Sequence, residues 1–422
     1  MLVRFISKEM NTETMLSPYR ALDLCNATGA LCGKILADLG CDVIKIENPG
    51  GDQARTLEPF YHDSPDPGKS LFWFAYNTSK RGITLKIDSK QGQEIFRELV
   101  KSTDFILESF SPGYMSSLHL AYEELAKINP GIIMTSITPF GQTGPYKDFK
   151  PSDIVAQAMG GLMFICGDAD RAPLRFSVEQ SYNQAGAQAA AASMIAFHHR
   201  QLTGQGQQVD ISVQECIATT AFQVQSYWDL IQLVLTREGS RTRRGRIAPK
   251  LIFECQDGYV SWRIFVADQG KKTNAVVDLM REWGEVEPEV KDVDFTKIDM
   301  NDIIQGELEL WEEGFSRFFA KHSRAELCTE AVKRDIMLFP VNSVKDLLAD
   351  EQLRVRKFWV NMEHPELNTN ITYPGAPFKA TETPWRISRR APLIGEHNQE
   401  IYGEDLRLSK EELRLLKEQG VI

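Results

Sequence analysis

Short apolar runs alternate with helix-patterned segments in the first third of this 422-residue chain, and no other feature restricts its fold as strongly. Two amphipathic stretches, Gly29–Gly40 and Ser89–Ser102, predict helices between the runs. The runs themselves predict five strands, at Tyr19–Leu24, Asp42–Glu47, Gly82–Ile87, Asp104–Leu107 and Gly131–Ile137. Strand–helix–strand repeats of this length make a doubly wound parallel sheet, whose ligands sit beyond the carboxyl ends of the strands. The dinucleotide pattern GxGxxG is absent, so this α/β fold does not imply NAD.

The pattern changes after residue 225, and it divides the chain into three parts. We expect a large Rossmann-like domain over 1–225, a smaller α+β domain over 226–345, and a return to the large domain over 346–422. Two apolar runs around Asp257-Gly258 predict a β-hairpin in the smaller domain. Further helices are predicted at Thr273–Trp283, Leu308–His322, Arg324–Asp335 and Ser409–Gly420. Residues 361–390, which are rich in Pro, Thr and Asn, are expected to run extended.

Composition and charge exclude several classes of function. A net charge of −10 argues against nucleic acid or an anionic membrane as the main partner, because both attract basic surfaces. The sequence has no apolar run of membrane-spanning length, and its N-terminus lacks the pattern of a secretory signal. The seven cysteines are scattered and form no CxxC pair, which favours reduced thiols over disulfides or a zinc site. We therefore expect a cytoplasmic protein that binds no metal.

The most specific pattern is the segment Val178–Ser212, which reads VEQSYNQAGAQAAAASMIAFHHRQLTGQGQQVDIS. It predicts an alanine-rich helix, a glycine turn over 203–207, and a strand that begins at Gln208. Five blocks precede it, namely LADLGCDVIKIE (36–47), NTSKR (77–81), ESFSPG (108–113), FGQTGP (140–145) and DIVAQAMGG (153–161). With the tail from Ala391, these blocks resemble the class III CoA-transferases, the family of formyl-CoA, carnitine and benzylsuccinate CoA-transferases. The likeness covers most of residues 18–215 and the tail.

This resemblance implies a fold, an assembly and a chemistry. Members of the family have a large Rossmann-type domain and a small domain, and each ring-shaped subunit is threaded through its partner. Their substrate is a coenzyme A thioester, and no cofactor is permanently bound. An aspartate at the start of the alanine-rich helix attacks the acyl-CoA thioester, forms a mixed anhydride and releases CoA thiolate. The thiolate returns to give an aspartyl-CoA thioester, and the acceptor carboxylate then completes the exchange.

Tyr182 occupies the position of that aspartate when Gly186 and Thr203 are aligned with the family without a gap. Tyrosine is a poor substitute for a carboxylate. With a reference pKa of about 10, only roughly one phenol in a thousand is ionised at pH 7.

Other residues near this position offer alternatives. Glu179, three residues earlier, is the fallback nucleophile, and its other interpretation is a first-turn carboxylate that complements the helix N-terminus. Asp153 is expected to be structural. His198 and His199 are expected to complement the C-terminal end of the helix.

Lys80, Arg81 and Phe110 are the residues that the resemblance assigns to CoA binding. A lysine can meet a phosphate as a point charge and an arginine as a fork, and the alternative for the basic pair is a solvated start of a strand. Ser117 stands where relatives tend to carry a phosphate-binding arginine, and Ser109 stands where they carry an asparagine. These departures around one pocket indicate that the pocket of this chain is no longer required to work.

The resemblance therefore implies a non-catalytic subunit of a heteromeric class III CoA-transferase, closest in type to the benzylsuccinate CoA-transferases of anaerobic aromatic degradation. A paralogous subunit would carry the aspartate, in a heterodimer or a heterotetramer. The donor would be succinyl-CoA and the acceptor an aryl-substituted succinate, which is an argument from analogy. Two alternatives stay open. One is an active homodimeric CoA-transferase or acyl-CoA isomerase that uses Glu179, and the other is a regulatory protein that binds CoA esters without turnover.

Overall fold

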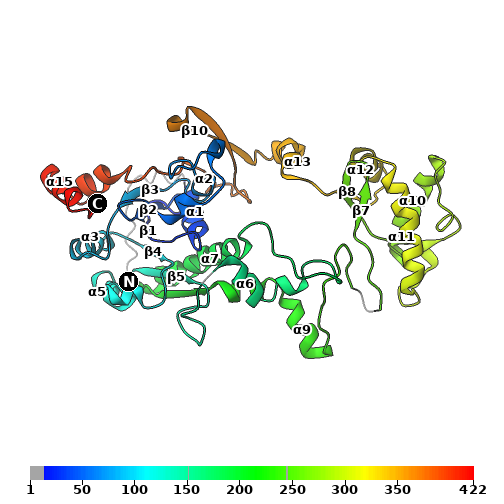
Figure 1. Ribbon diagram of the computed structural model, residues 1–422, viewed down its shortest axis with the longest axis horizontal. Coiled ribbons are helices and arrows are strands. Elements are labelled where there is room, and N and C mark those ends of the chain that lie inside the picture. Colours follow the sequence, from blue (N-terminus) through cyan, green and yellow to red (C-terminus); the bar gives the residue numbers. More distant parts are fainter. Residues whose placement is uncertain (1–13, 151, 244–245) are drawn as a thin grey trace. The chain divides into compact units, whose positions relative to one another are not determined.

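A computed structural model describes residues 14–150, 152–243 and 246–422 of the chain (Figure 1). The chain separates into two compact units. The first unit contains the residues up to Leu162 together with Arg175–Ser226 and Glu351–Ile422, so three separate stretches of chain build it. The second unit contains Met163–Leu174 and Tyr227–Asp350.

A parallel sheet with the strand order β3-β2-β1-β4-β5-β6 forms the centre of the first unit. Its strands are β1 (Arg20–Asp23), β2 (Asp42–Glu47), β3 (Arg81–Thr84), β4 (Phe105–Glu108), β5 (Ile133–Thr138) and β6 (Gln208–Ser212). Every residue of β3, β4 and β5 is buried, as expected for parallel strands that are covered on both faces. The six strands lie where the sequence predicts them, to within a few residues at their ends.

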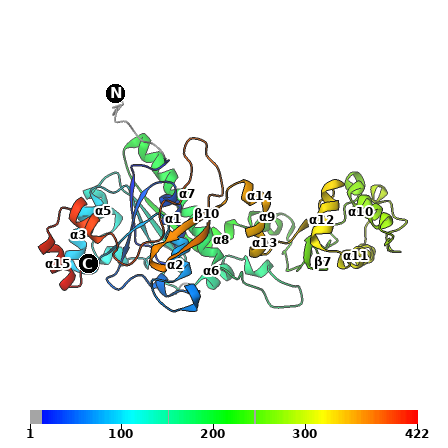
Figure 2. The ribbon, with the colours of Figure 1, turned by 90° about the horizontal axis from the view of Figure 1, so that it is seen from above.

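Helices cover both faces of this sheet (Figure 2). They are α1 (Ala30–Asp38) and α7 (Gln180–Thr203) on one face, and α3 (Lys90–Val100), α5 (Tyr122–Ile128) and α15 (Lys410–Glu418) on the other. Successive strand residues point to opposite faces, so Phe105 packs with α1 and α7 while Ile106 packs with α3 and α5. The first unit is therefore a three-layer α/β/α structure.

Gly186 allows α1 and α7 to lie in close contact. A Cβ atom at this glycine would stand 2.8 Å from the Cβ of Leu31 and 3.2 Å from the backbone nitrogen of Cys32. Any larger residue would push the amino-terminal ends of the two helices apart. Close packing of α1 on α7 therefore requires glycine at position 186, whatever the function of the chain.

The C-terminal stretch differs from its prediction. Instead of running extended throughout, it contains an antiparallel hairpin of β10 (Trp359–His364) and β11 (Thr369–Pro374). Asn368 turns the hairpin in a left-handed conformation, which asparagine adopts at low cost. Shorter helices complete the unit, namely α2 (Leu71–Tyr76), α4 (Tyr114–Ser117), α6 (Asp153–Met159), α8 (Val213–Thr219) and α14 (Glu351–Val355). Helix α9 (Phe222–Ile231) crosses the border between the units.

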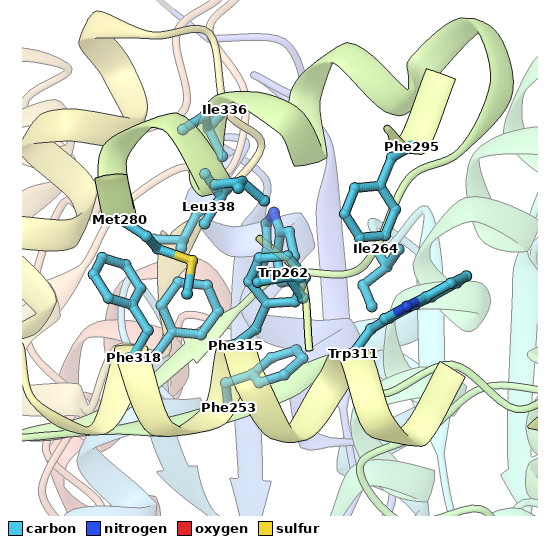
Figure 3. Close-up of a cluster of buried hydrophobic side chains, with 14 of the residues drawn as sticks. Phe253, Trp262, Ile264, Met280, Phe295, Trp311, Phe315, Phe318, Ile336 and Leu338 are labelled. Carbon is cyan, nitrogen blue, oxygen red and sulfur yellow. The ribbon is translucent and has the colours of Figure 1, made fainter. Parts of the chain in front are cut away.

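The second unit has a separate core of aromatic side chains (Figure 3). The predicted hairpin forms as β7 (Ile252–Cys255) and β8 (Gly258–Ser261), which pairs with β9 (Phe339–Pro340). Its helices are α10 (Gly270–Glu282), α11 (Gln305–Ala320), α12 (Arg324–Lys333) and α13 (Val344–Ala349). Trp262 packs edge-on against Phe315 and Phe319 of α11, with ring centroids 4.7 and 5.3 Å away. These contacts hold α11 against the small sheet.

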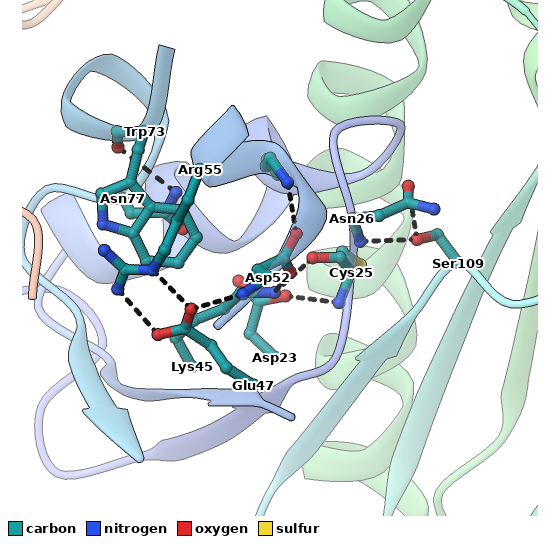
Figure 4. Close-up of polar contacts among 12 residues, drawn as sticks. Asp23, Cys25, Asn26, Lys45, Glu47, Asp52, Arg55, Trp73, Asn77 and Ser109 are labelled. Carbon is teal, nitrogen blue, oxygen red and sulfur yellow. Dashed lines mark hydrogen bonds and ion pairs between the residues drawn. The ribbon is translucent and has the colours of Figure 1, made fainter. Parts of the chain in front are cut away.

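Three buried ion pairs connect the carboxyl ends of β1 and β2 to the segments around them (Figure 4). The Lys80 Nζ atom lies 2.7 Å from Asp23 Oδ2, and Lys45 Nζ lies 2.8 Å from Asp52 Oδ2. Arg55 grips Glu47 with two hydrogen bonds, of 2.6 Å to Oε2 and 2.8 Å to Oε1. We call these three contacts the buried ion-pair chain.

The C-terminal return is fixed by the same set of contacts. Arg55 Nη2 donates to the carbonyl oxygen of Pro392 at 2.9 Å, and the indole of Trp73 donates to the same oxygen at 3.0 Å. The Arg55 guanidinium carbon also lies 3.7 Å from the centre of the Trp73 ring. The C-terminal stretch is therefore anchored, at Pro392, to a buried charge of the amino-terminal half.

Replacement of Lys80 by alanine is expected to destabilise the chain strongly. It leaves the Asp23 carboxylate buried without a counter-charge, which typically costs about 3–5 kcal/mol. The matched control is Lys101→Ala, which removes a lysine from an exposed pair with Glu98 and should change little. The urea midpoint followed by circular dichroism measures both. Equal midpoints for the two variants would contradict the structural role of Lys80.

Candidate functional site

The candidate site lies at the carboxyl edge of the sheet, where the strand order reverses. From β1 the chain adds β2 and β3 on one side and then β4, β5 and β6 on the other, so the loops after β1 and β4 diverge. Asn26 and Ser109 join these two loops (Figure 4). The Ser109 hydroxyl accepts from the Asn26 backbone at 2.9 Å and donates to Asn26 Oδ1 at 3.0 Å. Asn26 lines two cavities at this edge.

The first cavity has a volume of about 270 Å³. Apolar and polar groups share its walls, and the apolar part comes from Leu24, Ile46, Leu85 and Ile87 and from the rings of Phe110 and Tyr114. The two carboxylates that line it, Glu47 and Asp52, are already paired with Arg55 and Lys45. No lysine or arginine lines this cavity in the described part of the chain.

The second cavity has a volume of about 290 Å³ and shares Asn26 and Phe110 with the first. Its floor includes Thr28, and the loop after β5 contributes Lys147 and Phe149.

Tyr182 lies in the first turn of α7, beside the floor of the second cavity. Its side chain is half-buried. Burial raises the pKa of the Tyr182 phenol, the hydrogen bond with Thr28 opposes this, and the charges of Asp153 and Glu179 add to the rise. The phenol is therefore even less ionised at neutral pH than a free tyrosine.

Asp153 is fully used by hydrogen bonds that hold the start of α7. Its Oδ1 accepts from the backbone nitrogen of Ser181 at 3.0 Å and from the Ser181 hydroxyl, and its Oδ2 accepts from Gln157 at 2.5 Å. The carboxylate is buried. These contacts agree with the structural role that the sequence predicts for it.

Glu179 is the N-cap residue of α7, but its side chain caps no backbone nitrogen. It is exposed and lies one turn before Tyr182. Nearby, the Tyr76 hydroxyl of α2 donates to Asn183 Oδ1 at 2.8 Å. Whether Glu179 replaces the family aspartate stays a hypothesis. His198 and His199 are near the other end of α7, roughly 24 Å along the helix from Tyr182.

The predicted CoA-binding residues are not brought together. Lys80 is completely buried, so it is not the solvated start of a strand, and besides Asp23 it donates to Asn77 Oδ1 at 2.9 Å. Arg81 pairs with Asp42, the first residue of β2, and at 2.7 Å with Glu400. Neither lines the two cavities. A CoA contact for this pair stays a prediction, and the contacts that it makes favour a structural role.

Phe110, in contrast, lines both cavities. Its position depends on Glu108, the last residue of β4, whose Oε2 accepts from the Phe110 backbone at 2.8 Å. Burial raises the pKa of Glu108, while hydrogen bonds from Ser136 and from the Phe110 backbone oppose that rise. Thr28, Lys147 and Phe149 were not predicted as site residues. A usable signal exists, because all three stand in loops that directly follow predicted strands.

In 14–150, 152–243 and 246–422, no group of three or more His, Cys, Asp or Glu side chains is arranged to hold a metal ion. Within the same residues, no helix has the length and apolar character that crossing a membrane requires.

Comparison with known proteins places this geometry in a family. A model of CoA-transferase family III matches residues 16–398. The chain is 36% identical to the succinyl-CoA:(R)-benzylsuccinate CoA-transferase subunit BbsE of Thauera aromatica, over 91% of this chain and 93% of that protein. It is 30% identical to formyl-CoA:oxalate CoA-transferase of Streptomyces coelicolor, over 97% and 100%. A crystal structure of a CAIB/BAIF family protein from Brucella suis matches with a TM-score of 0.80 at 26% identity, over 93% of this chain and 99% of that chain.

Replacement of Asp153 by asparagine should lower the free energy of unfolding by about 1–3 kcal/mol. The new amide nitrogen is a donor, and it would face the donor of Gln157 or that of Ser181. Gln157 cannot relieve the clash by turning its amide, since its oxygen accepts from the Phe176 backbone at 3.2 Å. Asp148→Asn changes an exposed carboxylate beside the second cavity and serves as the control. Thermal unfolding distinguishes the two. An Asp153→Asn variant of unchanged stability would refute the structural role.

Proposed function

This chain belongs to CoA-transferase family III, and from that membership we propose that it is the non-catalytic subunit of a heteromeric CoA-transferase. The observation that carries the proposal is the side chain at the family's nucleophile position. Under the resemblance that matches Gly186 to a family glycine, that position is Tyr182, which is packed beside Thr28 with its phenol protonated. The chemistry of the exchange requires a carboxylate there, because an acyl group must form an anhydride that returns it to CoA thiolate.

Neither of the two nearby carboxylates is placed to substitute for the family aspartate. Asp153 is buried and its oxygens accept hydrogen bonds that fix α7. Glu179 is exposed, but it precedes the helix and is one turn away from Tyr182. The second candidate function, an active transferase or isomerase that uses Glu179, rests on this exposure alone.

The partner is proposed to be a paralogous subunit that carries the aspartate. The name of the Thauera aromatica relative, a subunit of a succinyl-CoA:(R)-benzylsuccinate CoA-transferase, supports a heteromer. By the same analogy the donor is succinyl-CoA and the acceptor an aryl-substituted succinate. A threaded, ring-shaped assembly belongs to this proposal and would make each subunit depend on the other for folding. Under this proposal the protein works in the cytoplasm.

The decisive experiment is native mass spectrometry of the chain purified from its own host, followed by a CoA-exchange assay on that sample. We expect equal amounts of this chain and of a paralogue with aspartate at the position of Tyr182. Activity should be found with the complex and not with this chain alone. An active assembly of identical chains would refute the proposal.

One variant tests the nucleophile position in the complex. Glu179→Gln should leave the exchange rate unchanged, because the partner's aspartate carries the covalent step; a loss of activity would instead favour the Glu179 alternative.

Tyr182→Asp in this chain should produce no exchange activity in the absence of the partner. The new carboxylate would be half-buried near the charge of Asp153, and the cavities beside it supply one lysine for the phosphates of CoA. The readout is the rate of CoA transfer per chain. A variant that becomes active on its own would show that the pocket is otherwise intact.

A further inference from the structure

The second cavity has the chemistry of a site for a small aromatic acid. Phe110 lines it from the loop after β4, and Phe149 lines it from the loop after β5. Phe149 is 51% exposed, although Tyr146 and Phe140 pack against it with ring centroids 4.9 and 6.0 Å away. A ring that is supported on one side and open to a concave surface on the other gains by covering its free face with another ring.

Polar groups in the same cavity suit one carboxylate. The exposed Lys147 lines it and supplies a positive charge. Asn26 adds an oriented donor. Its Oδ1 accepts from the backbone of Thr28 at 2.9 Å and from Ser109 at 3.0 Å. These two bonds fix the orientation of the amide, and Nδ2 is the atom that can donate to a ligand. Asp148 also lines the cavity and opposes an anion, so the balance of charge suits a weakly held acid.

A complete CoA thioester is matched less well. Phosphate groups are usually held by arginine forks or several cations, whereas Lys147 is the one basic residue that lines either cavity in the described chain. Ser117, where relatives tend to carry an arginine, donates its hydroxyl hydrogen bond to the Tyr114 carbonyl. A volume of about 290 Å³ also lies at the lower end of the range for small-molecule sites. It suits a single ring with its carboxylates.

We propose that the second cavity of this chain binds a small aryl carboxylate as the free acid, with Phe110 and Phe149 on its ring and Lys147 and Asn26 on its carboxylate. This inference rests on the proposed function in one respect, namely that the chain does not activate the acid that it holds. Tyr182, beside the floor of the cavity, offers no nucleophile. The subunit would therefore sense or retain the acceptor acid without converting it.

The test is calorimetric titration of the purified protein, in the assembly that its host provides, with benzylsuccinate and with succinate as probes. Binding by a partner subunit stays constant across variants of this chain, so differences between variants report on this cavity. Phe149→Ala should weaken benzylsuccinate binding roughly 2- to 10-fold and leave succinate unchanged, because an aromatic contact is removed. Lys147→Met should weaken both acids by about 2- to 5-fold.

Two charge variants complete the design. Asp148→Asn should tighten both acids, since it removes the opposing charge from the cavity. Lys150→Met is the matched control, because it removes an exposed lysine that does not line the cavity, and it should change neither affinity.

Three results would overturn the inference. They are an equal loss of both acids in Phe149→Ala, affinities that neither Phe149→Ala nor Lys147→Met changes, and no binding of either acid to the wild-type protein. These failures are distinguishable from failure of the proposed function. An active assembly of identical chains contradicts the proposed function whatever the titrations give. Absence of acid binding contradicts this inference and leaves a catalytic partner subunit possible.

Discussion

The buried ion-pair chain is the constraint on which the first unit depends. Each of its charges is removed from water, so each requires its partner at close range. Satisfying Asp23, Lys45 and Glu47 fixes the ends of β1 and β2, and the partners bring in the loop before α2 and the start of β3. Gly33 of α1 has room for no side chain beside Asp23, so the helix also takes its position from this contact.

This arrangement gives two of the blocks that resemble the family a structural role that is independent of catalysis. The block at 77–81 supplies Lys80 to Asp23, and the block at 36–47 supplies Lys45 and Glu47. Both are needed for the fold whether or not the site works. Tyr182, in contrast, takes no part in these ion pairs and lies in the first turn of α7 beside Thr28. A change of side chain there leaves the ion pairs beneath the carboxyl edge in place.

The sequence predicted the sheet well because its strands are buried on both faces and read as apolar runs, as in Phe105–Glu108 and Ile133–Thr138. It missed the hairpin at Trp359–His364 and Thr369–Pro374, whose faces are only partly buried and whose pattern is weak. For the candidate site, the position of Tyr182 followed from spacing along one helix. Phe149 and Lys147 were missed, although their loop follows a predicted strand, because their approach to Asn26 brings together loops that are far apart in sequence.

The first unit is built from three stretches, and this has a consequence for how the chain emerges from the ribosome. The Pro392 carbonyl that accepts from Arg55 is separated from it by 337 residues. At ordinary rates of protein synthesis, roughly 5–20 residues per second, the arginine waits on the order of 20–70 seconds for that oxygen. Throughout this interval the nascent sheet lacks its C-terminal cover, including α15. The topology therefore leaves apolar surface of the sheet uncovered during translation. We expect chaperones, or a subunit that is synthesised at the same time, to cover this surface.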